Sequence, residues 1–311
     1  MFIVLLGIFF FRFRRRREEL EIVPLHEDWE SWKWQILSFV LPKSELKNGW
    51  KKFKKTLKER ENKRAPTLFF LDFDGDLKAT EVDRLRHEIT AVLEAADSEL
   101  DEVFVRVSSG GGTVQDYGLG ATQLARIRQK GLRLVVGIDT IAASGGYLMA
   151  CVANRILAAP FAIVGSIGVI AQVPNFHRLL KRWDIDYREY TAGEFKKTIS
   201  YLGEITPKGE EKFLEQLELT HRFFKSFVHQ YRPNVDIDRL ATGEFWYGQK
   251  ALELGLVDEI QSSDEYLMKR YQEGYQVIKI KYLPKKNWAQ KMSEGMVTVL
   301  EKKLWKWLSQ A

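Results

Sequence analysis

Ile141-Ala-Ala-Ser-Gly-Gly-Tyr147 lies between two apolar runs of the sequence, Leu132–Ile138 and Tyr147–Val152. An apolar run, then small residues, then a second apolar run predicts a strand that turns sharply into a buried helix. The hydroxyl of Ser144 then lies beside N–H groups of the first helical turn, which lack partners within the helix. A developing oxyanion needs such donors. From this segment alone, helix capping explains Ser144 equally well.

A nucleophilic serine needs a general base, and no histidine of this sequence lies in a catalytic motif. The five histidines are His26, His87, His177, His221 and His229. Three of them, at positions 87, 221 and 229, fall in charged helical segments, and we expect them to be solvated. A lysine that burial keeps neutral can replace the histidine. The 48 lysines and arginines leave the choice of lysine open on chemical grounds alone.

Strand and helix patterns alternate around the serine turn, which predicts parallel βαβ units and an α/β fold. The predicted strands are Thr67–Phe73, Glu102–Val107, Leu132–Ile138, Arg155–Ala158 and Ile163–Ile170. Helices are predicted at Thr80–Ala96 and Val114–Gln129. Thr206 and Pro207 supply an N-cap and a first-turn proline, which open a long helix over Lys208–His229.

Several segments occur in the order found in one family of peptidases. They are Val105-Arg-Val-Ser-Ser-Gly-Gly-Gly112, Ala142-Ala-Ser-Gly-Gly-Tyr147, Ala162-Ile-Val-Gly-Ser-Ile-Gly-Val169, Tyr190-Thr-Ala-Gly-Glu-Phe-Lys-Lys197 with Leu202-Gly-Glu204, and Ala241-Thr-Gly-Glu-Phe-Trp-Tyr-Gly248 with Gly255-Leu-Val-Asp-Glu259. In these segments the sequence from Thr67 to Tyr282 resembles the SohB-type inner-membrane serine peptidases, relatives of signal peptide peptidase A. Each segment is a weak signal alone, and the shared order makes the resemblance strong.

The resemblance implies a Clp-protease/crotonase-like domain of repeated ββα and βαβ units. It also implies that Ser144 is the nucleophile and Lys196 the general base, because the family's lysine follows the glycine of Ala-Gly by three residues. The N–H groups of Gly111 and Gly145 resemble the oxyanion hole. Ser166 resembles the serine that orients the lysine. The implied reaction is hydrolysis of peptides through an acyl-enzyme, with no metal or organic cofactor.

One position departs from the family's pattern. Gly110 stands where the Ser-Pro-Gly-Gly turn of the family has proline. Three successive glycines lose more backbone entropy on ordering than a proline-stiffened turn does. We therefore expect an oxyanion hole that is poorly preorganised, or one that a substrate or a neighbouring subunit orders.

Three different functions compete with the peptidase. Phe70-Leu-Asp-Phe-Asp-Gly-Asp76 superficially resembles the opening of haloacid-dehalogenase phosphatases, with Asp72 as nucleophile, Asp74 as acid and magnesium bound by carboxylates. A core strand that ends in an acidic turn accounts for that segment better. The second is a catalytically inert scaffold of the same fold. The third is a crotonase-like acyl-CoA enzyme, which would leave the Ser144 and Lys196 pair unexplained.

Composition and charge suit a globular enzyme at an anionic surface. The chain has 311 residues, 45% of them hydrophobic, and a formal net charge of +6. Basic runs at Arg12–Arg17 and Lys51–Arg64 suit anionic membranes. Nucleic acid is the poorer candidate partner, because no zinc finger, RNA-binding signature or helix-turn-helix pattern accompanies these runs. The single cysteine, Cys151, excludes an intrachain disulfide and fits a small core residue.

The N-terminal segment favours membrane association without defining it. Met1–Phe11 is almost wholly apolar but spans about 16 Å as a helix, short of the roughly 30 Å hydrocarbon core. The resemblance implies an anchor in the inner (plasma) membrane of a bacterium, so this segment reads as a truncated transmembrane helix or one that enters a single leaflet. The tryptophan-rich Asp28–Leu41 suits an interface with lipid, or packing on the core or a sister subunit. The arginines after the apolar segment predict that this side of the membrane is the cytoplasm, whereas the family resemblance implies the outer face. The face of the membrane on which the peptidase lies therefore stays open.

We expect three parts in the chain. Residues 1–64 form a membrane-associated apolar segment, basic run and helical linker, residues 65–283 the peptidase domain, and residues 284–311 a C-terminal amphipathic helix. Besides peptide or unfolded protein substrates, membrane lipid and further copies of the chain are the expected partners. The homo-oligomer is implied by the resemblance alone.

Overall fold

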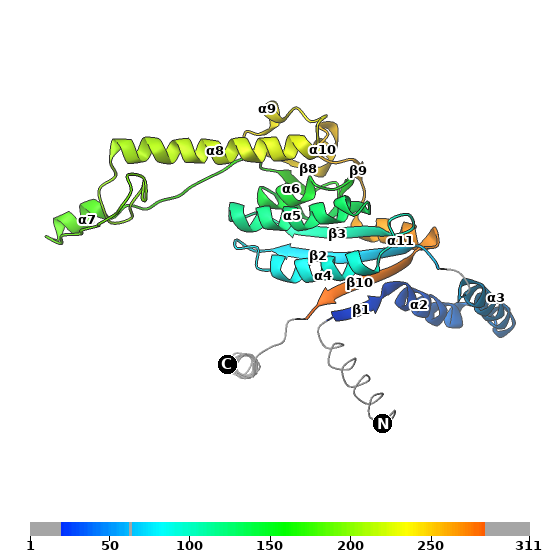
Figure 1. Cartoon of the computed structure of the whole chain (residues 1–311). Coiled ribbons are helices and arrows are strands. Elements are labelled where there is room, and N and C mark those ends of the chain that lie inside the picture. The colour runs from blue at the N-terminus through cyan, green and yellow to red at the C-terminus, as the bar shows by residue number, and fades with distance from the viewer. Residues whose placement is uncertain (1–19, 62–63, 284–311) are drawn as a thin grey trace, which may run out of the picture.

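The computed structural model describes residues 20–61 and 64–283 as a mixed α/β fold built on a ten-stranded sheet (Figure 1). Its main path runs in the order β1-β10-β2-β3-β4-β6-β9. Neighbours on this path are parallel, except that β1 is antiparallel to β10. The strands are β1 (Leu20–Pro24), β2 (Thr67–Gly75), β3 (Glu102–Ser109), β4 (Arg133–Ile138), β6 (Arg155–Ala158), β9 (Glu259–Ile260) and β10 (Gln276–Tyr282). The α/β class predicted from sequence is confirmed.

Helices cover both faces of this sheet, as the long apolar strands require. On one face α4 (Val82–Ala95) and α5 (Val114–Gln129) pack with α6 (Gly145–Ala150) in the larger hydrophobic core. On the other face α11 (Ser263–Gln272) covers a smaller cluster through Tyr266 and Leu267. We call the sheet with these four helices the body.

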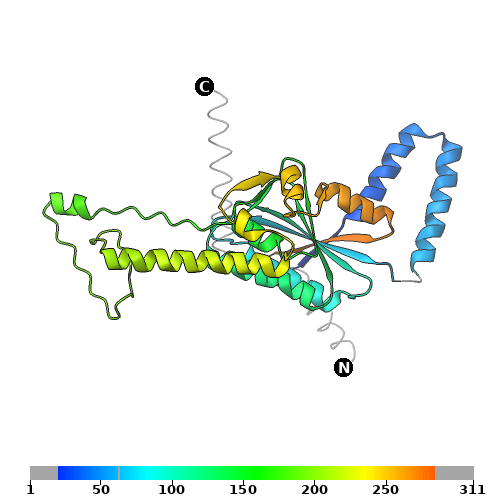
Figure 2. The ribbon, with the colours of Figure 1, turned by 90° about the horizontal axis from the view of Figure 1, so that it is seen from above.

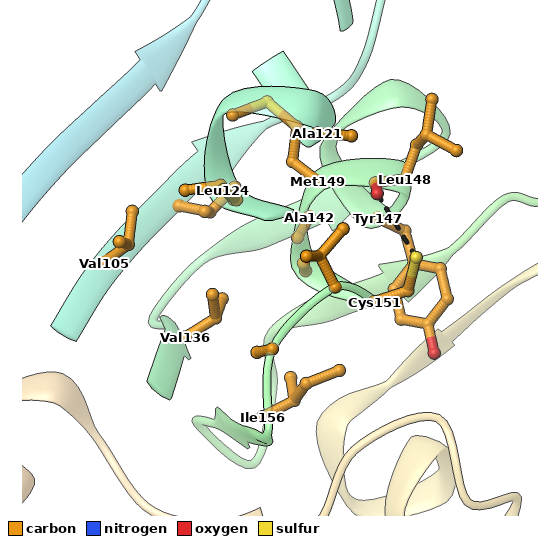
Figure 3. Close-up of a cluster of buried hydrophobic side chains, with 14 of the residues drawn as sticks. Val105, Ala121, Leu124, Val136, Ala142, Tyr147, Leu148, Met149, Cys151 and Ile156 are labelled. Carbon is orange, nitrogen blue, oxygen red and sulfur yellow. Dashed lines mark hydrogen bonds between the residues drawn. The ribbon is translucent and has the colours of Figure 1, made fainter. Parts of the chain in front are cut away.

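Helix α6 lies inside the larger core, which fixes the turn that precedes it. All six of its residues are buried, and Figure 3 shows Tyr147, Leu148 and Met149 among side chains of β3, β4 and α5. The hydroxyl of Tyr147 donates to the carbonyl of Leu256 at 2.9 Å. Cys151, predicted to be a core residue, is buried, and burial raises the pKa of its thiol. The thiol donates to the carbonyl of Leu148.

Three short strands branch from the main path and carry the serine turn. They are β5 (Ile141–Ala143), β7 (Ile163–Gly165) and β8 (Phe245–Tyr247). Ala142 of β5 pairs with Ser109 at the end of β3, and β7 lies between β5 and β8. The ends of β3, β5 and β7 therefore meet in one place.

Most predicted elements are confirmed, and two regions differ. The strand predicted over Ile163–Ile170 ends at Gly165, because Gly165 and Ser166 have φ values of 106° and 51°, which a strand does not accommodate. The sheet also takes in β1, from the segment that we assigned to the N-terminal extension. The predicted C-terminal helix lies outside the described residues.

Two protrusions leave the body at opposite ends (Figure 2). At one end α2 (Leu25–Val40) and α3 (Lys43–Glu61) form a helical hairpin. At the other end α8 (Pro207–Tyr231) projects beyond the sheet, and the segment from Ile170 to Thr206, which includes α7 (His177–Arg182), extends beside it. We call this segment the arm. The short helices α9 (Ile237–Leu240) and α10 (Gly248–Glu253) follow α8.

Candidate active site

Ser144 occupies the turn between β5 and α6 in a conformation that few non-glycine residues adopt. Its φ and ψ are 51° and −119°, and such a backbone costs on the order of 1–3 kcal/mol. The surroundings hold it there, because its N–H donates to the carbonyl of Gly165 at 2.8 Å and its carbonyl accepts from Leu148. No side-chain capping bond from Ser144 is present, so the capping interpretation fails. A strained, half-buried serine at a strand-to-helix turn is typical of a nucleophile.

Gly111 lies directly against this turn. A Cβ atom added at Gly111 would come within 2.7 Å of both the Gly145 nitrogen and the Ser144 Cβ. Gly111 also has a φ of 91°, which a side chain disfavours. Gly145 is restricted too, since a Cβ there would meet the Tyr117 ring at 2.4 Å. The structure therefore brings both predicted oxyanion donors beside Ser144.

The N–H of Gly111 is already occupied. It donates to the hydroxyl oxygen of Ser109 at 3.1 Å. Ser109 in turn hydrogen-bonds the hydroxyl of Tyr117, which donates to the carbonyl of Asp76. One of the two predicted oxyanion donors, the N–H of Gly111, is thus hydrogen-bonded to a side chain of the body.

A cavity of about 980 Å³ opens over the serine. Ser144, Ser166 and Gly111 all line it, so three of the predicted site residues share one hollow. Ser166, like Ser144, has a φ of 51°, and its N–H donates to the carbonyl of Glu244 at 2.7 Å. The wall is mainly apolar, formed by Leu77, Val114, Val169, Ile170, Leu214 and Leu217. An apolar hollow beside a strained serine suits a peptide side chain next to a scissile bond.

Lys196 does not line that cavity. It lies on the arm, exposed, with its N–H bonded to the carbonyl of Gly193. The neighbouring Phe195 ring lies 5.7 and 5.4 Å from the ammonium groups of Lys208 and Lys212, which places this turn at the N-terminal end of α8. In the single chain, Lys196 and Ser144 are therefore in separate regions.

The adjacent Lys197 is already paired. Its ammonium lies 2.6 Å from the carboxylate of Glu189, and this bond raises the pKa of Lys197. A raised pKa is the opposite of what a general base requires.

His221 was missed by the sequence analysis. We expected it to be solvated, and that prediction is wrong for its ring, because Nε2 is buried without a hydrogen-bond partner and the residue lines the cavity. His87 and His229 are exposed, as expected. The helical pattern of charges could not distinguish the three, since only the tertiary fold places one face of α8 over the serine.

The acidic residues at the end of β2 and in the turn after it make structural contacts. Asp72 bonds the guanidinium of Arg106 at 2.7 Å and the ammonium of Lys279. Asp76 accepts from the N–H of Thr80, which lowers the pKa of its carboxyl. Within residues 20–61 and 64–283, no cluster of three metal-binding side chains is present. A phosphatase nucleophile at Asp72 is therefore disfavoured by its two structural ion pairs.

Comparisons with known proteins show the family of the chain. A family model for peptidase family S49 matches residues 126–277, and a model for the N-terminal part of that family matches residues 1–124. "Probable protease SohB" of Haemophilus influenzae is 48% identical over 283 residues, covering 86% of this chain and 80% of the relative. The chain belongs to peptidase family S49. "Probable protease SohB" of Buchnera aphidicola subsp. Schlechtendalia chinensis is 46% identical, covering 82% of this chain and 88% of the relative. The predicted SohB-type family is confirmed, and with it a peptidase.

A solved structure is more distantly similar. It is a lysine-to-alanine mutant of the 1510-N membrane-bound stomatin-specific protease in complex with a substrate peptide. Its sequence is 11% identical to this chain, and the superposition covers 75% of this chain and 99% of the solved chain, with a TM-score of 0.43. At that level of similarity no residue role carries over to this chain.

Proposed function

We propose that the chain is a membrane-associated serine endopeptidase in which Ser144 is the nucleophile and Lys196 the general base. The observation that carries this proposal is the strained conformation of Ser144, held beside Gly111 and Gly145 at the floor of an apolar cavity. Backbone strain of this kind is retained where it serves a function. Membership of a peptidase family supplies the reaction class.

In the proposed reaction Lys196 carries the proton in both the acylation step and the deacylation step. Neutral Lys196 takes the proton of the Ser144 hydroxyl as the oxygen attacks a peptide carbonyl. The lysine then protonates the leaving amine, and an acyl-enzyme remains. A water molecule, deprotonated by the same lysine, attacks the ester and releases the acid and the serine. Ser166, on the cavity wall, is proposed to accept a hydrogen bond from the lysine and orient its amine.

The oxyanion hole is proposed to form from the N–H groups of Gly145 and Gly111. The bond from Gly111 to Ser109 must first be exchanged for one to the oxyanion. The absence of proline at position 110 makes that exchange of backbone orientation easier. Losing one oxyanion donor typically costs about 100- to 1000-fold in rate.

The arm is proposed to deliver Lys196 to the serine of a second copy. Within the described residues, ten large apolar side chains of the arm are exposed: Ile170, Phe176, Leu179, Trp183, Ile185, Tyr187, Tyr190, Phe195, Tyr201 and Leu202. Exposed apolar side chains in this number favour a protein partner. A homo-oligomer that covers the arm would bury Lys196, and burial would lower its pKa towards that of a working base.

The substrates are proposed to be peptides or unfolded segments near the membrane, cleaved signal peptides among them. The apolar wall of the cavity favours hydrophobic side chains. In this proposal residues 65–283 form the catalytic unit, with β1 as an added edge strand, and residues 1–64 hold it at the inner membrane of a bacterium. The part of the chain that the structure describes contains no helix long and apolar enough to span a bilayer.

Activity-based labelling tests the proposal. A fluorophosphonate should label the wild type at Ser144 and leave Ser144→Ala unlabelled, while Lys196→Ala labels far more slowly. Lys197→Ala, adjacent on the same turn, serves as the matched control and should label like the wild type. Labelling that persists in Ser144→Ala would falsify the assignment. An unlabelled wild type that still assembles would favour an inert scaffold, and binding of CoA thioesters an acyl-CoA enzyme.

A further inference from the structure

Helix α2 carries one apolar stripe that the body covers only at its start. Its residues recur at helical spacing on one side: Leu25, Trp29, Trp32, Ile36, Phe39 and Val40. Leu25 and Trp29 pack on the smaller core cluster, where the Trp29 ring lies 5.6 Å from the ring of Tyr271 in an edge-on contact. The hairpin is thus fixed to the body by the first turns of this stripe.

Beyond Trp29 the stripe leaves the body and lies open. Trp32, Ile36, Phe39 and Val40 are 56%, 64%, 92% and 68% exposed within the described structure. Two turns of helix with four large uncovered apolar side chains are unusual on a soluble surface.

The contact with α3 uses a different side of the helix. Trp34 packs against Trp50 and Phe53, with ring centroids 5.0 and 5.6 Å apart. The hairpin is therefore closed by its own aromatic contacts, and the open stripe is not needed to hold it together.

Exposed lysines stand on the second helix of the hairpin. Lys43, Lys47 and Lys51 recur every four residues along α3, which places them on one side of it. The sequence of α3 holds seven lysines and one arginine against three glutamates, a net charge of 8 − 3 = +5. The acidic residues of α2 lie at its start, and Glu30 there accepts a hydrogen bond from the Tyr271 hydroxyl of the body. The basic charge is therefore on the projecting part of the hairpin.

We infer that the open stripe of α2 is a docking surface for an anionic lipid membrane. Tryptophan and aliphatic side chains on an open helix face, in a hairpin whose second helix is basic, are the combination that settles at a bilayer surface. The net positive charge of α3 opposes the approach of a second, identical hairpin and attracts acidic headgroups. Charge complementarity thus selects lipid over a second copy as the occupant.

This surface lies at the end of the body opposite the arm (Figure 2). Binding through α2 leaves the arm and the cavity over Ser144 uncovered. The inference depends on the hairpin alone, so cleavage of a soluble peptide reports separately on the proposed protease.

A fluorescent label at the tip of the stripe tests the inference in the full chain. Phe39→Cys, labelled with an environment-sensitive dye such as NBD, places the probe at the most exposed stripe position. Cys151 is buried and its thiol pKa is raised, so the native cysteine does not compete. Phe161→Cys is the matched control, because Phe161 is 84% exposed on the body. Vesicles of phosphatidylglycerol and phosphatidylcholine should shift the position-39 emission to the blue and leave position 161 unchanged.

Two further variants separate the apolar and electrostatic contributions. Phe39→Glu should weaken vesicle binding about tenfold or more, since a large side chain loses its burial in the interface. Lys47→Gln with Lys51→Gln should weaken binding to anionic vesicles about fivefold per lysine, with little change on neutral ones. Added salt should reduce the same binding.

Three outcomes would overturn the inference. The first is a chain that binds vesicles while the position-39 probe stays in water, which would assign binding to another segment. The second is a blue shift that rises with protein concentration in the absence of vesicles, which would assign the stripe to a second copy. The third is no binding to anionic vesicles at all.

Discussion

The body that holds Ser144 and the arm that carries Lys196 are built in opposite ways. Around the serine, β3, β4 and α6 are almost entirely buried, and the turn is fixed by backbone hydrogen bonds. Along the described arm, from Ile170 to Thr206, Ser200 is the one buried residue. The serine is positioned by its own chain, whereas the lysine needs a second surface to position it.

The serine is thus preorganised by the fold of its own chain, whereas the lysine depends on assembly with a second surface. A buried, hydrogen-bonded turn holds one conformation because leaving it exposes apolar surface and breaks its bonds. A segment with little buried surface gains almost nothing from any one conformation. Activity that depends on Lys196 is therefore expected to depend on what covers the arm.

The largest expected effect on kcat comes from a substitution on the arm. Lys196→Ala should lower kcat by about a thousandfold or more, because the serine loses its base while the oxyanion donors remain. Lys197→Ala removes a neighbouring charge that is paired with Glu189 and should change kcat less than about threefold. Peptide hydrolysis under saturating substrate measures both. Equal losses in the two variants would mean that this turn acts through its fold rather than through one amine.

The next largest effect is expected from a substitution at the buried turn that holds Ser144. Gly111→Ala places a methyl group 2.7 Å from the Gly145 nitrogen and the Ser144 Cβ and should cost about 100- to 1000-fold in kcat/KM. Gly274→Ala is the control, since Gly274 also has a positive φ, 98°, but open space around it. That variant should lose about 1–2 kcal/mol of stability and keep its kcat. Full activity in Gly111→Ala would remove this glycine from the oxyanion hole.

A buried carboxyl makes the stability of the body depend on pH. Burial raises the pKa of Glu88 to about 7, although its Oε1 accepts the N–H of Tyr282 at 2.8 Å. Between pH 4.5 and 7 the folded state keeps a proton that the unfolded chain releases. The free energy of unfolding contributed by Glu88 is therefore fully present below pH 4.5 and is lost as the pH rises through 7, on the order of 3 kcal/mol.

Urea unfolding of the wild type and Glu88→Gln across this window measures the effect. The difference between the two proteins should change with pH, since the variant has no proton to lose at this position. A difference that stays constant from pH 4.5 to 7.5 contradicts the raised pKa.

His221 is expected to contribute on the cavity wall. Its buried, unpartnered Nε2 gains a partner when a peptide binds, so His221→Phe should lower kcat/KM about tenfold, mainly through KM. His229→Phe, two turns further along α8 and exposed, should leave kcat/KM unchanged. Steady-state kinetics with one peptide series measures both, and an unchanged KM in His221→Phe would place the ring outside the binding site.

The smallest effect is a gain. Gly110→Pro restores the proline that the family has at this turn, and a Cβ at position 110 meets only the Ile141 side chain at 3.8 Å. Because proline stiffens the turn, we expect kcat to rise a few-fold. Equal or lower turnover in the variant counts against the idea that this turn is poorly preorganised.

The sequence predicted the part of the site around Ser144, where the neighbouring residues along the chain determine the local structure. The strand, small residues and apolar helix around Ser144 specify the turn by their own pattern, and the resemblance to the peptidase family pointed to the glycine turn beside it. Three features depend on distant contacts and were missed: the pairing of β1 with β10, the early end of β7 at Gly165, and the face of α8 that bears His221. The position of Lys196 relative to Ser144 belongs to the same class, since no local pattern fixes the arm.

Activity in a mixture of two inactive variants is the most direct test of the account. Ser144→Ala keeps the lysine and Lys196→Ala keeps the serine, so each alone lacks one member of the pair. If the arm of one copy serves the serine of another, an equimolar mixture should recover peptide hydrolysis to about a quarter of the wild-type kcat, because one pairing in four restores both groups. A mixture that stays as inactive as its components, although the two variants assemble with one another, would contradict a site shared between copies.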